Sequence, residues 1–176
     1  MKKLIELLSF TFQKENKIII WILVLGFILS LLLGCFLPLP AQIKMIRPFI
    51  QQEFPEWKLT GKYGAIRSDG GSGDRYHLGC DYSVPSGTSV IAPQDGEIII
   101  SKYIGNYGNV IFIEHGFGVQ TRIAHLSEFV KLRGSKVRQG DLIAYSGDTG
   151  NAKGRPHIHF ETLLNGINKH PAEFIF

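Results

Sequence analysis

Histidines and an aspartate occur in two short motifs with the spacing of alternate strand positions. In the first motif, YHLGCD, His77 and Asp81 are four residues apart. In an extended chain the residues i, i+2 and i+4 share a face, so both side chains would point the same way with Gly79 between them. A lone His–Asp pair is usually a hydrogen bond, so this motif leaves a metal site and a structural contact both open.

The second motif, PHIHFE, is more informative. His157, His159 and Glu161 would lie on one face of a strand, and Ile158 and Phe160 would lie on its apolar face. Two histidines at i and i+2 can reach one ion, and imidazole is a common zinc ligand. The alternative is a half-exposed strand with incidental histidines, but the presence of the first motif in the same domain favours a metal site.

The remaining histidines and the second cysteine carry less information. His125 lies between an alanine and a leucine at the predicted end of a strand, and His115 and His170 are expected at the surface. Cys80 could bind zinc, but strand parity turns it, with Leu78, away from the two polar residues of the first motif. We therefore predict that Cys80 is a small core residue.

The elements that position these motifs are short, β-branched runs bounded by glycines and turns. We predict strands over 97–103, 109–115, 119–125, 142–145 and 156–163. No run shows helical periodicity with caps. Several short strands at near-regular spacing predict an all-β fold, either a compact antiparallel β-sandwich or a partly open barrel.

Composition excludes several classes of protein. The chain has 176 residues, is 44% hydrophobic and carries a formal net charge of +4. This apolar fraction is too high for a disordered chain. The basic residues form no dense patch interleaved with aromatic residues, so we expect no nucleic-acid partner. Two cysteines do not make a disulfide framework.

A long apolar run lies near the N-terminus. Residues 18–40 contain no charge, and a helix over 18–37 would rise about 1.5 Å per residue and so span about 30 Å, the thickness of a bilayer core. Lysines are in excess before the run, so the positive-inside rule predicts a cytoplasmic N-terminus. The predicted order is a cytoplasmic segment (1–17), a transmembrane segment (18–40), a linker (41–56) and an extracytoplasmic domain (57–176).

Cys35 offers an alternative to an uncleaved anchor. The sequence LLGC resembles the lipobox of bacterial lipoproteins, in which the cysteine is lipidated and becomes the new N-terminus. The apolar run is longer than a usual signal core and continues past Cys35, so we expect an uncleaved anchor. Both interpretations attach the chain to a bacterial inner or plasma membrane, with the domain outside the cytoplasm.

Taken in order, the motifs His-x-Gly-x-Asp, Ala-His-Leu and Pro-His-x-His-Phe-Glu resemble those of the lysostaphin-type zinc metallopeptidases, the M23 family. The stretches 83–93, 137–147 and 148–154 also resemble the family, and the resemblance covers about residues 62–174. It implies a compact β-fold with a groove. It also implies an enzyme that cleaves peptide bonds in the stems or crossbridges of bacterial peptidoglycan.

The resemblance also implies a role for each motif residue. Zinc would be bound by His77, Asp81 and His159, and His125 and His157 would be the unligated catalytic histidines. Three protein ligands would leave one position for water, whose pKa zinc lowers toward about 7. An unligated histidine can take a proton or stabilise an oxyanion, and the sequence does not divide these roles between the two.

Two other functions use similar residues. A non-catalytic peptidoglycan-binding or hydrolase-activating module of the same fold would usually lack ligands, whereas all five motif positions are filled here. A facial-triad Fe(II) oxygenase would also use two histidines and a carboxylate, but its first pair is typically spaced His-x-Asp. We therefore expect a membrane-anchored endopeptidase with one Zn²⁺ per domain that acts on peptidoglycan peptides.

Overall fold

The computed structural model describes residues 43–53, 55–66 and 76–175. The predicted cytoplasmic and membrane-spanning segments, 1–17 and 18–40, lie outside these residues. Across the ranges that are described, no helix has the length and apolar character needed to cross a membrane. The same ranges contain β-strands and short 3-10 helices but no α-helix.

The described part of the chain contains ten strands, and every strand pair is antiparallel. They are β1 (Lys58–Gly61), β2 (Cys80–Ser83), β3 (Ser89–Ile91), β4 (Gly96–Ile104), β5 (Gly108–Glu114), β6 (Val119–Phe129), β7 (Lys136–Val137), β8 (Leu142–Ser146), β9 (Ile158–Leu164) and β10 (Ile167–Lys169). The short helices are η2 (Gln51–Glu53), η3 (Gly105–Tyr107), η4 (Gly150–Ala152) and η5 (Pro171–Glu173). The predicted all-β, antiparallel class is confirmed.

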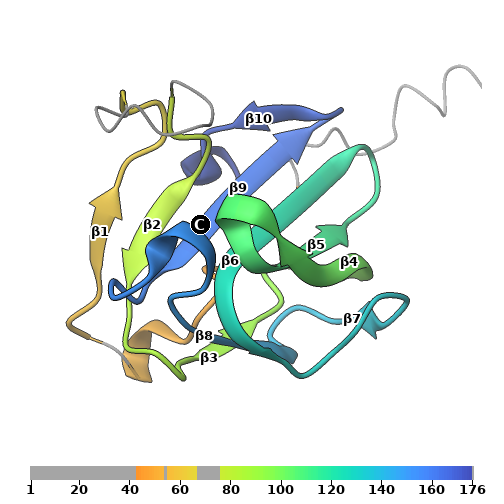
Figure 1. Ribbon diagram of the computed structural model, residues 1–176. Helices are drawn as coiled ribbons and strands as arrows, with labels where there is room; N and C mark the ends of the chain where they lie inside the picture. Colours follow the sequence, from red (N-terminus) through yellow and green to blue (C-terminus); the bar gives the residue numbers. More distant parts are fainter. Residues whose placement is uncertain (1–42, 54, 67–75, 176) are drawn as a thin grey trace, which may run out of the picture. The chain divides into compact units, whose positions relative to one another are not determined.

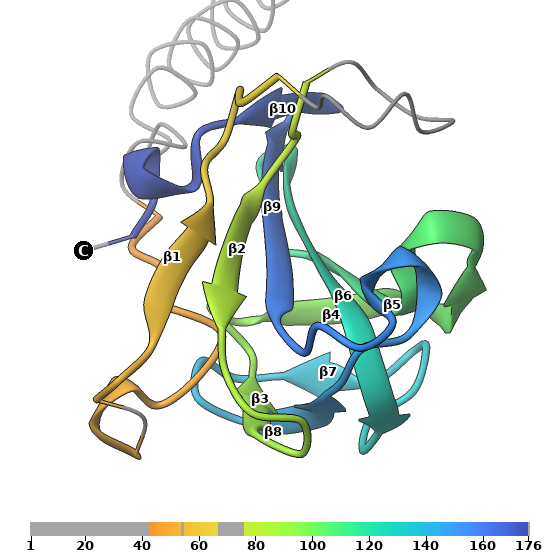
Figure 2. The same cartoon turned by 60° about the vertical axis from the view of Figure 1, so that its left-hand side comes forward.

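The strands form one hydrogen-bonded sheet in the order β1-β2-β9-β6-β5-β4-β7 (Figure 1). β10 pairs with β9, and β8 pairs with both β3 and β6. β6 therefore has three partners: β5 along much of its length, β9 along its first half and β8 along its second half. Figure 2 shows β2, β9 and β6 running alongside one another, with β3 and β8 lower in the view.

Alternating residues of β2 and β9 separate the core from the polar face. Cys80 lies opposite Phe160 across the two strands, and both belong to the hydrophobic core together with Ile158. The predicted apolar face of β9 and the core position of Cys80 are therefore confirmed. Leu78 is only half-buried, because the chain bends at Gly79 and β2 begins one residue later.

The core also takes in residues from the predicted linker. Met45 and Phe49 are 1% and 2% exposed, and the Met45 amide donates a hydrogen bond to the Phe174 carbonyl at 2.8 Å. The Phe49 ring packs against the rings of Trp57 and Tyr82, at centroid distances of 5.7 and 5.5 Å. The predicted domain boundary at residue 57 is therefore too late, since these apolar side chains of the 41–56 segment are buried against the strands.

Gly79 is needed for the close approach of the first motif to β9. A Cβ built at Gly79 would lie 2.9 Å from the carbonyl carbon of Phe160 and 3.0 Å from Cγ of Glu161. We expect Gly79→Ala to lower the free energy of unfolding by about 1–3 kcal/mol, the usual cost of overpacking. It should also weaken metal binding, because the two groups it displaces adjoin the candidate metal centre. Urea denaturation and zinc titration measure the two effects.

Gly134→Ala is the matched control for the loss of a glycine. Gly134 has a φ of +88° and no atom within 4 Å of a built Cβ, so its replacement strains the backbone without moving a neighbour. Zinc affinity should be unchanged in Gly134→Ala. Normal stability and normal zinc affinity in Gly79→Ala would contradict the steric argument.

Candidate active site

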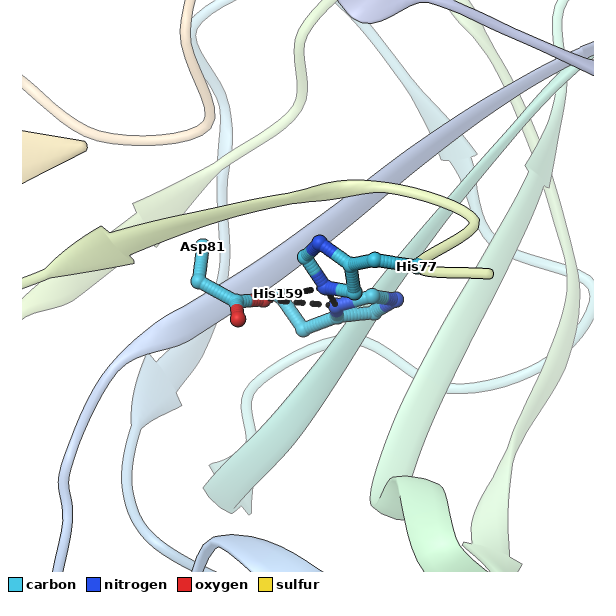
Figure 3. Close-up of side chains that lie close together, drawn as sticks. All are labelled: His77, Asp81 and His159. Carbon is cyan, nitrogen blue, oxygen red and sulfur yellow. Dashed lines mark hydrogen bonds and ion pairs between the residues drawn. The ribbon is translucent and has the colours of Figure 1, made fainter. Parts of the chain in front are cut away.

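Three side chains converge from the loop before β2, from β2 and from β9 (Figure 3). Oδ1 of Asp81 lies 3.0 Å from Nε2 of His77 and 2.7 Å from Nδ1 of His159, and the two nitrogens are 3.1 Å apart. Both histidines are buried, at 5% and 3% exposed. The structure thus brings together the three residues that were predicted to bind a metal.

Strand register accounts for two of these positions and a bend accounts for the third. Asp81 and His159 are direct partners across β2 and β9, so their side chains meet on the polar face. The prediction that residues 77–81 form one extended strand is wrong, because the chain bends at Gly79. His77 is held outside β2 by a hydrogen bond from its amide to the Ala65 carbonyl at 2.9 Å.

The donor atoms fit a zinc ion. Two imidazole nitrogens and one carboxylate oxygen lie within 4.8 Å of one another. At zinc–ligand distances of about 2.0–2.1 Å and tetrahedral angles, such atoms would be about 3.3 Å apart. The observed separations of 2.7–3.1 Å are smaller by a few tenths of an ångström, so a slight outward movement of the side chains would admit the ion. Two imidazoles with a carboxylate also match the three-ligand sets of catalytic zinc.

Within the cluster, the carboxylate of Asp81 is paired with the protonated imidazole of His159. Burial alone would raise the pKa of Asp81, but hydrogen bonds from His159 and His77 keep this pKa well below its usual range. Burial would lower the pKa of His159, but its hydrogen bonds to Asp81 and Glu161 raise this pKa to about 9. A metal must displace that proton, so zinc binding weakens as the pH falls.

His125 and His157 lie beside the cluster, with ring centroids 4.6 Å apart. Nε2 of His157 is 3.8 Å from Oδ1 of Asp81. Nδ1 of His125 lies 2.9 Å from the carbonyl oxygen of Thr149, and Nδ1 of His157 lies 2.7 Å from that of Arg155. A carbonyl only accepts, so Nδ1 carries the hydrogen, and Nε2 of each neutral ring is a proton acceptor.

His125 occupies a strained position in the middle of β6. Its φ is +64°, and β6 pairs with β9 as far as Ala124 and with β8 from Leu126 onward. The prediction that His125 ends a strand is therefore wrong, because β6 continues to Phe129 after a change of partner. Burial, followed by the neighbouring His157, lowers the pKa of His125 to about 4, so the ring is neutral at neutral pH.

The five residues open into a cleft of about 710 Å³. Thr60 and Ile66 line one part of the cleft, and Asn151, Arg155 and Pro156 line another. Ile66 is 65% exposed, so the cleft wall is accessible from outside. The predicted groove corresponds to this cleft.

Glu161 has contacts that the sequence did not reveal. The sequence placed it on the face of His159 but gave it no role. Its carboxylate accepts hydrogen bonds from Tyr107 Oη at 2.7 Å, Arg122 Nη1 at 3.2 Å and Asn168 Nδ2 at 3.0 Å. Only the i+2 spacing from His159 could have indicated it, because the three donors come from η3, β6 and β10.

Comparison with known protein families shows to which family this chain belongs. Residues 75–171 match peptidase family M23, and this range includes all five predicted site residues. The chain belongs to peptidase family M23. The family resemblance seen in the three motifs is thereby confirmed, and zinc is the metal of this family.

Relatives of the M23 domain include longer bacterial proteins. The chain is 44% identical over 97 residues to the DD-carboxypeptidase/endopeptidase Mpg of Neisseria meningitidis, covering 55% of this chain and 22% of that protein. It is 40% identical over 95 residues to the peptidoglycan DD-endopeptidase ShyC of Vibrio cholerae, covering 54% and 22%. The chain thus spans about a fifth of the length of these relatives.

One solved structure that resembles this domain is that of a protein containing zinc. The crystal structure of a zinc-containing peptidase from Vibrio cholerae matches with a TM-score of 0.62 and 28% identity, covering 70% of this chain and 37% of that chain. That protein contains zinc, and the M23 domain described here has a His-Asp-His cluster with the donor set that zinc prefers. Zinc is therefore the cofactor of this domain.

Single substitutions should separate ligands from catalytic groups in the M23 site. We expect His77→Ala, Asp81→Ala and His159→Ala to lose zinc together with activity, because each removes a donor atom. His125→Ala and His157→Ala should keep most of the zinc and lose turnover by about 10²–10⁴-fold, the usual range for a general acid–base group. Zinc content and the rate of peptide hydrolysis are measured for each purified variant.

Cys80→Ser is the control for this series. The thiol is buried in the core, so this variant should keep its metal. Circular dichroism checks that each variant is folded. Zinc lost from His157→Ala but retained by His159→Ala would reverse the assignment of the ligating histidine.

Proposed function

We propose that this chain is a zinc metalloendopeptidase that hydrolyses peptide bonds in peptidoglycan stems or crossbridges. The observation that carries the proposal is a His-Asp-His cluster with two more histidines beside it in an open cleft. Membership of family M23 supports the reaction class. The relative that is a peptidoglycan DD-endopeptidase supports the substrate class.

The proposed reaction needs a metal and a proton acceptor in one site. When bound, zinc supplies a Lewis acid and lowers the pKa of a water molecule. His125 and His157 direct Nδ1 at carbonyl oxygens, so each can take a proton at Nε2. After protonation the same atom can donate to an oxyanion or to the leaving amine. The low pKa of His125 keeps it neutral, and therefore ready to accept, throughout the physiological pH range.

A non-catalytic wall-binding or hydrolase-activating module remains the second candidate. Such a module needs the cleft but no complete site. Here three donor atoms converge and two further histidines adjoin them, an arrangement that binding alone does not require. The complete site favours hydrolysis.

Digestion of purified peptidoglycan tests the proposed activity. Residues 41–176 should release new peptide fragments, and mass spectrometry of the muropeptides identifies the bond that is cut. A chelator should abolish the release, and zinc or cobalt should restore it, because the cluster loses its metal and regains it. The double variant His125→Ala/His157→Ala is the inactive control.

Two outcomes would contradict this proposal. Unchanged muropeptides with a zinc-loaded, folded protein would favour the wall-binding module. Stoichiometric iron with oxygen-dependent turnover would favour the oxygenase chemistry that the same residue types allow.

We also propose that residues 18–37 anchor the chain in a bacterial membrane with the domain outside the cytoplasm. The uncharged run supports the anchor, and its length suits a bilayer. Lys2, Lys3, Lys14 and Lys17 precede the run, which supports a cytoplasmic N-terminus.

A fusion reporter checks this topology. Alkaline phosphatase fused after Phe176 should be active in cells, because the enzyme folds only outside the cytoplasm, and a fluorescent protein that matures only in the cytoplasm should stay dark. The opposite pattern would contradict the proposed orientation. Palmitate labelling that is lost in Cys35→Ala would identify the chain as a lipoprotein instead.

A further inference from the structure

One of the four site histidines is held differently from the others. His77, His125 and His157 each direct Nδ1 at a backbone carbonyl oxygen, at 2.7–2.9 Å. His159 is reversed: Nδ1 points into the metal cluster, and Nε2 lies 3.0 Å from Oε1 of Glu161. For Nδ1 to offer its lone pair to a metal, the hydrogen of the neutral ring must be on Nε2, so an acceptor is required there. Glu161 is that acceptor.

Glu161 is fixed from three sides. It is 1% exposed, and Oε1 accepts from the Tyr107 hydroxyl while Oε2 accepts from Arg122 and Asn168. These donors come from η3, β6 and β10, so the carboxylate is tied to three separate elements. With His159, four donors surround two carboxylate oxygens, which matches the accepting capacity of an ionised carboxylate.

Glu161 also adjoins the segment that carries His77. The Asn168 amide that donates to Glu161 is also 3.2 Å from the Leu78 carbonyl. Cγ of Glu161 would lie 3.0 Å from a Cβ at Gly79. Glu161 therefore contacts the His159 ring directly, and it is linked to the segment of His77 through Asn168.

We propose that Glu161 is a positioning residue of the metal centre, which fixes the orientation and tautomer of His159, and that Tyr107, Arg122 and Asn168 hold Glu161 for this purpose. The inference rests on the proposed zinc site but not on peptidoglycan being the substrate. A carboxylate behind a ligating imidazole also makes the ring a stronger donor, and loss of such a partner typically weakens metal binding by about 10–100-fold.

The choice of a carboxylate follows from the donors around it. Glutamine has nearly the same shape as glutamate, but one of its two oxygens is replaced by an NH₂ group, which only donates. In Glu161→Gln this NH₂ group must face either His159 and Tyr107 or Arg122 and Asn168. In the first orientation the N–H of His159 loses its acceptor, although the Tyr107 hydroxyl can accept from the NH₂ group. In the second orientation the NH₂ group faces only the donors of Arg122 and Asn168, so the amide that still accepts from His159 is displaced.

Zinc affinity is the direct test, because it needs no substrate. The 176-residue chain, its Glu161→Gln variant and its Glu128→Gln variant are stripped of metal and titrated with zinc against a chromophoric chelator. Glu128 is an exposed glutamate of β6, so Glu128→Gln is the matched control and should bind zinc like the parent chain. We expect the dissociation constant to rise by about 10–100-fold in Glu161→Gln.

The visible spectrum of cobalt(II) in the site adds a readout that a merely structural role would not move. The ligand-field bands should shift in Glu161→Gln and stay unchanged in Glu128→Gln, while circular dichroism remains that of the folded parent. Unchanged affinity together with an unchanged cobalt spectrum in Glu161→Gln would overturn the inference.

Tyr107→Phe keeps the inference testable if Glu161→Gln fails to fold. It deletes one hydroxyl, so Glu161 keeps its charge and three of its donors. We expect a smaller loss of zinc affinity, several-fold, and an intact fold. Unchanged affinity in Tyr107→Phe beside an unfolded Glu161→Gln would count against positioning. If the parent chain binds zinc and loses it in these variants but cuts no peptidoglycan, the proposed substrate fails while this inference stands.

Discussion

The register between β2 and β9 is the constraint on which the rest of the site depends. It places Asp81 opposite His159, and it places the flanking pairs, Cys80 with Phe160 and Tyr82 with Ile158, in the core. A shift of β9 by one residue would turn Phe160 outward and the polar side chains of His159 and Glu161 inward. The hydrophobic effect that buries one face of β9 therefore also fixes which polar atoms meet on the other face.

Two local irregularities of the backbone bring His77 and His125 close to the Asp81–His159 pair. The bend at Gly79 returns His77 to the cluster, and the left-handed backbone of His125 lies where β6 changes partner from β9 to β8. A non-glycine residue in that conformation costs about 1–3 kcal/mol and persists where the surrounding structure determines it. Here two strand ladders determine it, and the result is a histidine aimed into the cleft.

Sequence alone predicted what depends on local alternation and on motif order. The apolar face of β9, the core position of Cys80 and the five clustered residues all follow from period-two spacing and the family resemblance. The bend at Gly79, the passage of β6 through His125 and the burial of Met45 could not be predicted, because each depends on partners distant in the sequence. The same holds for the donors around Glu161, which come from three elements that only the folded chain brings together.

The two faces of β9 separate the hydrophobic core from the candidate metal centre, and this separation bears on whether the protein folds before it binds its metal. Nineteen buried residues form the hydrophobic core, and no candidate metal ligand is among them. On the other side a proton on His159 can satisfy Asp81 before any ion arrives. Folding of the described domain then does not require the ion, unlike that of small zinc modules that are unfolded without it. A chain of this design can be made and folded before zinc is supplied, and under the proposed function it would stay inert until then.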